Sequence, residues 1–381
     1  MNYRKFGKLD WQVSALGFGA MRLPLVEGTE DIDEELAQKM VRTAIDGGVN
    51  YVDTAYGYHR SKSEEFVGRA LKDGYREKVH LATKMPSWLV KTHDDLDRLL
   101  EEQLTRLDDD HIDFYLLHAL NAKYWKNYKA LNVFEWAEKK ISEGVISHLG
   151  FSFHDDYPVF HEIINGYDNW TFCQVQHNYM DIDHQQGQKG VNEAAERGLA
   201  VVVMEPIRGG SLAKEPSPGP VSEAMKRSSR AWKPAEWALQ WVWDQPQVSV
   251  VLSGMSTMQQ VEENLVSASR SGAGMLSSDD LAVIEDVRKA YYSLTPIPCT
   301  KCEYCLPCPS DVAIPSIFAL YNEAAMYGSA GGQRWQYANN IKPENRADNC
   351  IECGTCENVC PQKIEIIDWL KKADAFLLAK D

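Results

Sequence analysis

The chain has 381 residues and a formal net charge of -15 at pH 7. This acidity argues against nucleic acid and anionic membrane surfaces as main partners, because both bind clustered Lys and Arg. The N-terminus lacks the apolar run of a signal peptide, and no stretch approaches the roughly 18 apolar residues of a membrane span. We therefore expect a cytoplasmic protein without a membrane partner, built as one large domain and a small appendage.

Short apolar runs alternate with amphipathic stretches through the first 270 residues. Eight runs have the length and β-branched content of strands: 13–21, 49–55, 79–84, 112–119, 146–152, 171–177, 199–206 and 248–255. Helical spacing follows each of them, near 33–46, 62–72, 93–107, 129–143, 156–165, 188–197, 234–244 and 257–268. This α/β pattern predicts a closed parallel (β/α)8 TIM barrel, whose active site lies at the C-terminal ends of the strands.

Four polar side chains fall at or just after the ends of strands two to four in this prediction: Asp53, Tyr58, Lys84 and His118. A phenol is a weak acid at neutral pH, and a nearby cation that favours its ionised form strengthens it. Lys84, itself held by Asp53, can supply that charge to Tyr58. A histidine beside them can orient a carbonyl oxygen and stabilise the charge that develops on it.

At this point the chain resembles the aldo-keto reductase superfamily over about residues 1–270. The matching motifs occur in family order: DTAYGYH at 53–59, TKMP at 83–86, YLLHAL at 115–120, GFS at 150–152 and EEN at 262–264. The resemblance implies that Tyr58 is the general acid toward the carbonyl of a small carbonyl or alcohol substrate, with hydride from NADP or NAD in reduced form. Lys84 and Asp53 would tune the tyrosine, and His118 would orient the substrate.

The same resemblance implies a set of cofactor contacts. Ser152 and Gln174 match positions that hold the nicotinamide carboxamide, and Glu263 and Asn264 match positions that contact adenine. Met204 stands where many members stack a tyrosine on the nicotinamide ring; its alternative role is that of an apolar core residue.

The last loop departs from the pattern of members that favour NADPH. Gly254 and Gln260 occupy the positions where those members carry Lys and Arg, so the choice between NADPH and NADH stays open. Ser253, Ser256 and backbone amides at the start of the last helix can hold a phosphate. Arg208, in EPIRGG, is a further candidate cation.

Eight of the nine cysteines lie after residue 298, in two short motifs: Cys299, Cys302, Cys305 and Cys308, then Cys350, Cys353, Cys356 and Cys360. The second motif is C-x2-C-x2-C-x3-C-P, the bacterial ferredoxin spacing in which three thiolates bind one cluster and the fourth binds another. We therefore predict two 4Fe-4S clusters, with one as an alternative. Cys360 would complete the first cluster and Cys308 the second, although the gap before Cys308 is one residue shorter than usual.

Zinc is the main alternative for these cysteines, because eight thiolates can make two four-cysteine sites. A third cysteine at the same step is superfluous for zinc. The spacing therefore favours iron-sulfur clusters.

The whole chain resembles a family of reductases whose barrel is followed by a ferredoxin-like module. The predicted division is a barrel at 1–272, a linker helix at 273–298 and a small, mainly helical ferredoxin-like domain at 299–381.

Three functions follow from this organisation. The first is a carbonyl reductase whose clusters are structural or contact a redox-partner protein, and this is the interpretation we favour. The second is an electron-coupling enzyme with a flavin or a one-electron acceptor, because nicotinamide gives two electrons together whereas a cluster takes one. The third is an electron carrier or redox sensor on a barrel without catalytic activity.

Segment 213–237, rich in Pro and Ser, is expected to form a long loop at the active-site end.

Overall fold

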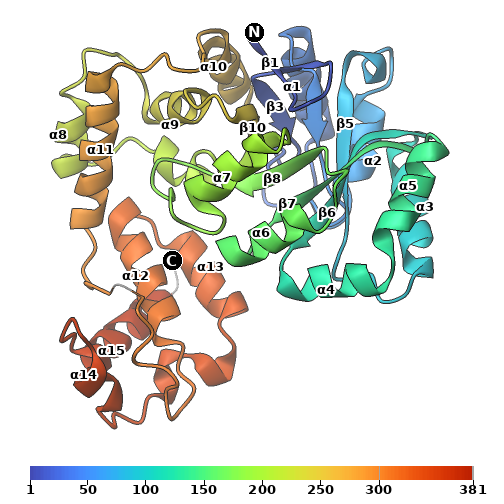
Figure 1. Cartoon of the computed structure of the whole chain (residues 1–381). Helices are drawn as coiled ribbons and strands as arrows, with labels where there is room; N and C mark the ends of the chain where they lie inside the picture. Colours follow the sequence, from blue (N-terminus) through green and yellow to red (C-terminus); the bar gives the residue numbers. More distant parts are fainter. Residues whose placement is uncertain (300, 380–381) are drawn as a thin grey trace. The chain divides into compact units, whose positions relative to one another are not determined.

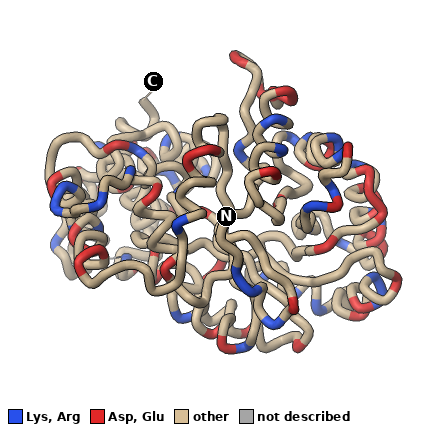
Figure 2. The backbone as a smooth tube through the Cα atoms, turned by 90° about the horizontal axis from the view of Figure 1, so that it is seen from above, with Lys and Arg blue, Asp and Glu red and all other residues tan. Residues whose placement is uncertain are grey.

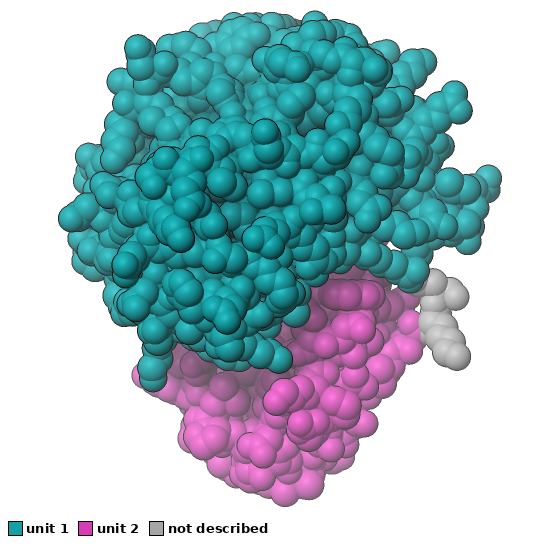
Figure 3. Space-filling view, turned by 90° about the vertical axis from the view of Figure 1, so that its right-hand side faces the viewer, with its two compact units in different colours: residues 1–214, 232–277 teal, residues 215–231, 278–381 magenta. Residues whose placement is uncertain are grey.

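The structure is a computed structural model that describes residues 1–299 and 301–379. The chain divides into two compact units, coloured separately in Figure 3. Unit 1 comprises residues 1–214 and 232–277, and unit 2 comprises residues 215–231 and 278–381. This division into compact units does not test the domain boundaries predicted at 272 and 298, which stay predictions.

Unit 1 is a closed parallel barrel, as the sequence predicted (Figure 1). Its strands follow chain order around the ring, and β10 closes against β3. They are β3 (Leu16–Gly19), β4 (Tyr51–Asp53), β5 (His80–Met85), β6 (Ile112–Leu120), β7 (Ile146–Phe153), β8 (Phe172–Gln176), β9 (Ala200–Met204) and β10 (Val248–Ser253). All eight fall inside or across the predicted runs.

Helices surround the barrel: α1 (Glu34–Asp46), α2 (Ser63–Ala70), α3 (Asp94–Leu107), α4 (Ala122–Ala130), α5 (Val133–Ser142), α6 (Tyr157–Asn165), α7 (Gly187–Glu196), α9 (Pro234–Trp243) and α10 (Met258–Ser269). Short 3-10 turns are η1 (Arg76–Lys78) and η2 (Arg208–Ala213). The helix predicted from 129 is interrupted, because Asn132 takes a left-handed conformation with φ 52° and separates α4 from α5. A helix tolerates such a residue only at its ends.

The first predicted strand is split in the structure. Residues Gln12–Ser14 form β2, which pairs antiparallel with β1 (Tyr3–Lys5), and only Leu16–Gly19 joins the barrel. Phe6, between the hairpin strands, is fully buried and lies 4.7 Å from the ring of Phe114 inside the barrel. The apolar run at 13–21 therefore belongs to two elements, the barrel wall and a hairpin whose loop fills the barrel interior.

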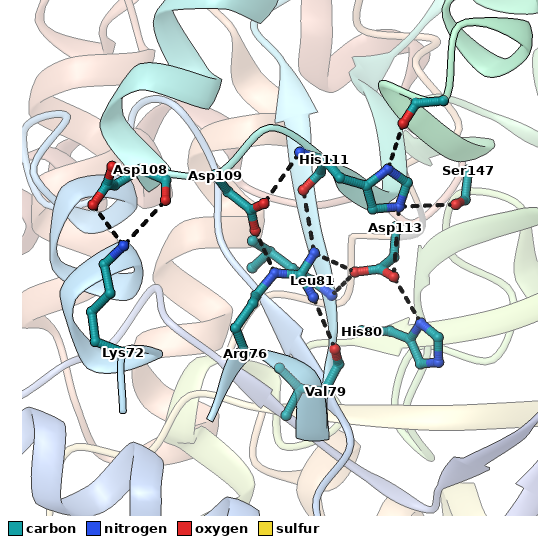
Figure 4. A network of polar contacts seen from close by, with 11 residues as sticks. Lys72, Arg76, Val79, His80, Leu81, Asp108, Asp109, His111, Asp113 and Ser147 are labelled. Atoms are coloured by element: carbon teal, nitrogen blue, oxygen red, sulfur yellow. Dashed lines mark hydrogen bonds and ion pairs between the residues drawn. The ribbon is translucent and has the colours of Figure 1, made fainter. Parts of the chain in front are cut away.

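A polar network ties the N-terminal ends of β5 and β6 together (Figure 4). Arg76 contacts Asp109 and, at 2.9 Å, Asp113, and His80 Nδ1 lies 3.0 Å from Asp113. Burial alone would raise the pKa of Asp113, but hydrogen bonds from His80 and the Leu81 amide and the charge of Arg76 lower that pKa to about 2. This network lies at the end of the strands opposite to the predicted active site, so its role is stability.

Unit 2 is mainly helical. It contains α8 (Pro220–Met225), α11 (Ser278–Ser293), α12 (Ile314–Tyr327), α13 (Gly331–Asn340), η3 (Pro343–Asn345), η4 (Ala347–Asn349), α14 (Thr355–Val359) and α15 (Ile366–Leu377). Buried Ile317, Phe318 and Leu370 belong to its apolar core. The segment expected as a long loop contains α8, which packs against α11. This part of it therefore belongs to the fold of unit 2.

Acidic and basic residues are interspersed along the chain in Figure 2. In the part of the chain that the structure describes, no helix has the length and apolar character needed to span a membrane.

Candidate active site

The alternation of side chains along the barrel strands builds the candidate site. Interior positions are filled by residues such as Tyr51, Ala82, Leu116, Phe172 and Val202, which form one apolar cluster. Two residues further along each strand the side chain points the same way, one layer closer to the C-terminal end. That layer consists of Asp53 on β4, Lys84 on β5, His118 on β6, Ser152 on β7, Gln174 on β8 and Met204 on β9. Polar groups therefore replace apolar ones at the ends of five of these strands, and Met204 is the apolar member of the layer.

A buried ion pair is the centre of this layer. Lys84 Nζ donates to both carboxylate oxygens of Asp53, at 2.7 and 2.8 Å, and to the carbonyl oxygen of Thr54 at 2.7 Å. Burial works to lower the pKa of Lys84, but the charge of Asp53 and hydrogen bonds outweigh it and raise that pKa. Burial raises the pKa of Asp53, against the charge of Lys84. Lys84 thus keeps its proton and presents a fixed positive charge at the barrel mouth.

Tyr58 lies next to this cation, in the turn between β4 and α2. Lys84 Nζ is 5.1 Å from the centre of the Tyr58 ring. Burial raises the pKa of Tyr58, while the charge of Lys84 and a hydrogen bond with it act to lower that pKa. Lys84 acts on the pKa of Tyr58 in the expected direction, but burial has the larger effect, so that pKa lies above its ordinary value.

The backbone after Tyr58 is unusual. His59, Arg60 and Ser61 all take left-handed conformations, with φ of 49°, 55° and 67°, which residues other than glycine rarely adopt. Hydrogen bonds hold this turn, including one from the Ser63 amide to the Tyr58 carbonyl at 3.3 Å. Strained backbone of this kind persists where the surrounding structure holds it and is common at functional sites.

His118 faces Tyr58 across the mouth, with ring centres 6.2 Å apart and planes at 83°. Burial lowers the pKa of His118 well below its ordinary value, and the charges of Lys84 and His154 lower it further. Its imidazole is therefore neutral at pH 7 and can donate one hydrogen bond. The exposed ring of Trp88 lies 5.2 Å from the His118 ring and adds an apolar wall.

Ser152 and Gln174 are neighbours in register on β7 and β8. Both are buried, and Ser152 Oγ accepts a hydrogen bond from the Ala119 amide at 2.7 Å. Gln174 Nε2 lies 3.7 Å from the sulfur of Met204, whereas Gln174 Oε1 is buried with no hydrogen-bond partner among the described residues. Because an orphaned buried acceptor is costly, Gln174 Oε1 fits a site for a ligand with N–H donors, such as a carboxamide.

The loop after β10 uses most of its predicted cofactor residues for its own conformation. Asn264 Nδ2 donates to Ser253 Oγ at 3.0 Å, and the Ser256 amide donates to Gln260 Oε1 at 2.7 Å. These bonds hold the start of α10, which Thr257 caps by accepting from the Gln260 amide. The side-chain oxygen and the backbone amide of Gln260 therefore both form hydrogen bonds within the loop and the start of α10.

Two other predicted cofactor residues have protein partners. Arg208 Nε lies 3.1 Å from a carboxylate oxygen of Asp181. Glu263 Oε1 accepts from Lys233 Nζ at 2.5 Å. The guanidinium of Arg208 therefore pairs with the Asp181 carboxylate and is not a free cation.

Sequence reasoning missed the two contacts that depend on loop conformation. The Thr54 carbonyl that binds Lys84 carries no side-chain signal. Arg22, just after the first barrel strand, lies beside Gly254, just after the last one. A search for charged residues at every strand end would have found Arg22, as it found Lys84.

In unit 2 the electrostatic surroundings of Cys305 include three other cysteines of the predicted first cluster. Burial raises the pKa of Cys305, and the neighbouring Cys299, Cys302 and Cys360 raise it further. Cys360 comes from the second motif and acts on a cysteine of the first, so the two motifs approach each other in the fold. The crossed pairing of the ferredoxin spacing stays a prediction.

In the second motif, Cys350 lies near Cys356. Burial raises the pKa of Cys356 to about 11, and the charge of Cys350 adds to it. Among the described residues, no three His, Cys, Asp or Glu side chains lie close enough to hold a single metal ion. A 4Fe-4S cluster needs a different arrangement, because each of its four thiolates binds a different iron.

A closed parallel barrel with a buried cation and carboxylate at the C-terminal ends of its strands has the architecture of a TIM-barrel enzyme. Residues 15–288 match the aldo/keto reductase family, and the chain belongs to that family. Residues 298–365 match the 4Fe-4S dicluster domain. The protein is thus an oxidoreductase of this family that carries an iron-sulfur domain.

Individual proteins agree with this assignment. An uncharacterized oxidoreductase of Bacillus subtilis strain 168, YqkF, is 28% identical over 332 residues, which is 77% of this chain and 100% of the relative. L-galactose dehydrogenase of Arabidopsis thaliana is 26% identical over 77% of this chain and 96% of the relative. The holo structure of aldo-keto reductase AKR11C1 from Bacillus halodurans is 27% identical, with a TM-score of 0.62, over 76% of this chain and 97% of that one.

Proposed function

We propose that the protein reduces a small aldehyde or ketone, or oxidises the matching alcohol, at the mouth of the barrel. The observation that carries this proposal is the layer of inward-facing groups around the Lys84–Asp53 pair, with Tyr58 and His118 beside it. A barrel kept only as a scaffold has no physical need for a buried lysine–carboxylate pair at its mouth, because apolar residues of similar size often stabilise a fold as well as such a pair does. The sugar dehydrogenase among the relatives supports the same carbonyl and alcohol chemistry.

NADPH or NADH, when bound, supplies the hydride that reduces the carbonyl carbon. Ser152 and Gln174 would hold its carboxamide, since Gln174 Oε1 lacks a protein donor, and Met204 would pack against its ring. Ser253, Ser256 and Asn264 would line the adenosine end. The lysine and arginine typical of NADPH-specific members are absent at positions 254 and 260, so the proposal includes both cofactors.

The protein groups then have separate tasks. Tyr58 donates its phenolic proton to the carbonyl oxygen as the C–H bond forms, so that an alcohol leaves. Lys84 stabilises the phenolate that remains, because its positive charge lies beside the Tyr58 ring. His118 is neutral and donates a hydrogen bond to the same carbonyl oxygen. This hydrogen bond positions the carbonyl oxygen between the rings of Tyr58 and His118.

The iron-sulfur domain supports a second role. We propose two 4Fe-4S clusters, one bound by Cys299, Cys302, Cys305 and Cys360 and the other by Cys350, Cys353, Cys356 and Cys308. Cys302 and Cys353 are exposed, which favours electron exchange with a redox-partner protein over a purely internal role. The clusters are structural if no partner oxidises or reduces them.

The test is anaerobic oxidation of NADPH and NADH against a panel of small aldehydes and ketones, for the parent and for Tyr58→Phe. Loss of a single general acid is expected to lower kcat by about 100- to 10,000-fold, with iron content unchanged. Equal rates in the two proteins, or no reaction across the panel, would contradict barrel catalysis and favour the electron-transfer role.

A further inference from the structure

Arg22 lies between two loops that belong to the end of the barrel sequence. It follows β3, the first barrel strand, yet its stem packs against Gly254 after β10, the last one. A Cβ added to Gly254 would meet Arg22 Cγ at 2.8 Å and Arg22 Cβ at 3.0 Å, and a Cβ added to Gly209, after β9, would lie 3.9 Å from Arg22 Nη2. The Arg22 carbonyl also accepts a hydrogen bond from Ser256 Oγ at 2.7 Å. The guanidinium therefore extends from the loop after β10 toward the loop after β9.

The guanidinium has no hydrogen bond or ion pair with any side chain or carbonyl in residues 1–299 and 301–379, and Arg22 is exposed. Its backbone and stem are nevertheless held, by Ser256 and by the close contact with Gly254. A flexible surface arginine has no need for a glycine opposite its stem. Gly254 thus makes room for Arg22, in the position where NADPH-specific members carry a lysine.

Other cations near these loops are committed to protein partners. Arg208 pairs with Asp181, and Lys233 pairs with Glu263. Gln260, which stands where related sequences carry an arginine, accepts from the Ser256 amide. Arg22 is the cation that the structure presents to both loops at once.

The loops after the seventh and eighth strands of a (β/α)8 barrel are a frequent place for phosphate groups. In this chain those strands are β9 and β10. Arginine binds phosphate oxygens through two parallel N–H donors. We propose that Arg22 binds the diphosphate of the nicotinamide cofactor from its place between the loops after β9 and β10. This inference rests on the proposed function.

Because the diphosphate is common to both cofactors, Arg22 contributes equally to NADH and NADPH binding. A charge-assisted hydrogen bond contributes about 1.5–3 kcal/mol, which is roughly 10- to 100-fold in affinity. The test is equilibrium binding of NADH, NADPH and ADP-ribose to the anaerobic full-length protein, by calorimetry. Arg22→Gln is expected to weaken all three ligands by about 10- to 100-fold. Arg98→Gln, which removes an exposed arginine on α3 that pairs with Asp95, is the matched control and is expected to change none of them.

A second variant tests the geometry without removing the charge. Gly254→Ala places a methyl group 2.8 Å from Arg22 Cγ, so it must displace the arginine, and it is expected to weaken the three ligands in the same way. In the Arg22→Gln background the alanine should have little further effect, because both changes act on one interaction.

Three results would overturn the proposal. Unchanged affinities in Arg22→Gln would show that Arg22 binds no part of the cofactor. A loss confined to NADPH would assign Arg22 to the 2′-phosphate instead of the diphosphate. A parent protein that binds none of the ligands would contradict the proposed function itself, whereas a parent that binds them and an Arg22→Gln variant that binds equally well would contradict this inference alone.

Discussion

Replacement of Lys84 by methionine removes the cation of the buried pair at the barrel mouth and leaves its partner in place. Lys84 and Asp53 have side-chain exposures of 0% and 3%, and their closest N–O distance is 2.7 Å. Methionine fills similar space without charge. The Asp53 carboxylate then has no cation in an environment where burial already raises its pKa.

The expected cost follows from this burial. Removal of one partner of a buried ion pair typically destabilises a protein by about 3–5 kcal/mol, whereas replacement of both partners by neutral groups of similar size is often close to neutral. We therefore expect Lys84→Met to lower the free energy of unfolding by about 3–5 kcal/mol near neutral pH. With Lys84 absent the pKa of Asp53 rises further above its unfolded value. The contribution of Asp53 to the stability of the variant is thus greatest below its unfolded pKa and decreases as the pH rises through its folded pKa.

Urea denaturation of the anaerobic protein, followed by tryptophan fluorescence, measures this change. The double variant Lys84→Met, Asp53→Asn should recover most of the lost stability. Lys62→Met is the matched control, because Lys62 pairs with Asp31 at 2.6 Å but both side chains are more than half exposed, and exposed pairs contribute about 0–1 kcal/mol. The reasoning is refuted if Lys84→Met costs no more than the control, or if the double variant is no more stable than the single one.

Two further predictions concern other parts of the molecule. The pKa of Asp113 is lowered from 3.8 to about 2, so its contribution of about 2 kcal/mol is present above pH 4 and lost as the pH falls toward 2; acid denaturation of Asp113→Asn should show a smaller loss over that interval, and an identical acid profile would refute this. Iron and sulfide analysis of the parent should give about eight of each per chain if two 4Fe-4S clusters are bound, and Cys302→Ser should lose about four irons while Cys308→Ser loses those of the other cluster; zinc without sulfide would contradict both.

The barrel could be predicted from the sequence because its pattern is local. Each strand is a short β-branched run, each helix has its own apolar stripe, and the order of eight such units allows one simple closed arrangement. Asp53, Lys84 and His118 were proposed because they fall at strand ends, and the period of two along a strand explains why they lie in one layer, since each lies two residues beyond an interior position of its strand. The same rule places Ser152 and Gln174 side by side.

Features that depend on distant parts of the chain were not predictable in this way. The hairpin of β1 and β2 was missed because Val13 and Leu16 belong to one continuous apolar run, and only the barrel interior, filled by Phe6, separates their roles. Arg22 was missed because its contact with Gly254 joins the first and last strands. The net pKa of Tyr58 was also not predictable, since the sequence shows the cation of Lys84 but not the burial that outweighs it.

The cysteine spacing was more informative than the loops. C-x2-C-x2-C-x3-C-P predicts that Cys360 completes the first cluster, and in the structure the charge of Cys360 acts on Cys305 of the first motif. The role of Cys308 in the second cluster stays a prediction. The gap before Cys308 is one residue shorter than usual, and the spacing does not determine the conformation of the loop that contains it.

Transfer of deuterium tests the central claim most directly. The parent protein, prepared anaerobically with its clusters, is given a carbonyl substrate from the active panel and a nicotinamide cofactor deuterated at C4 on the transferred face. The account predicts one deuterium atom on the carbinol carbon of the product alcohol, because hydride moves directly to the carbonyl carbon while Tyr58 supplies the oxygen-bound proton. Alcohol without deuterium, formed as the cofactor is oxidised, would show that electrons travel through the clusters and a solvent proton reaches carbon, and would contradict catalysis by hydride transfer at the barrel mouth.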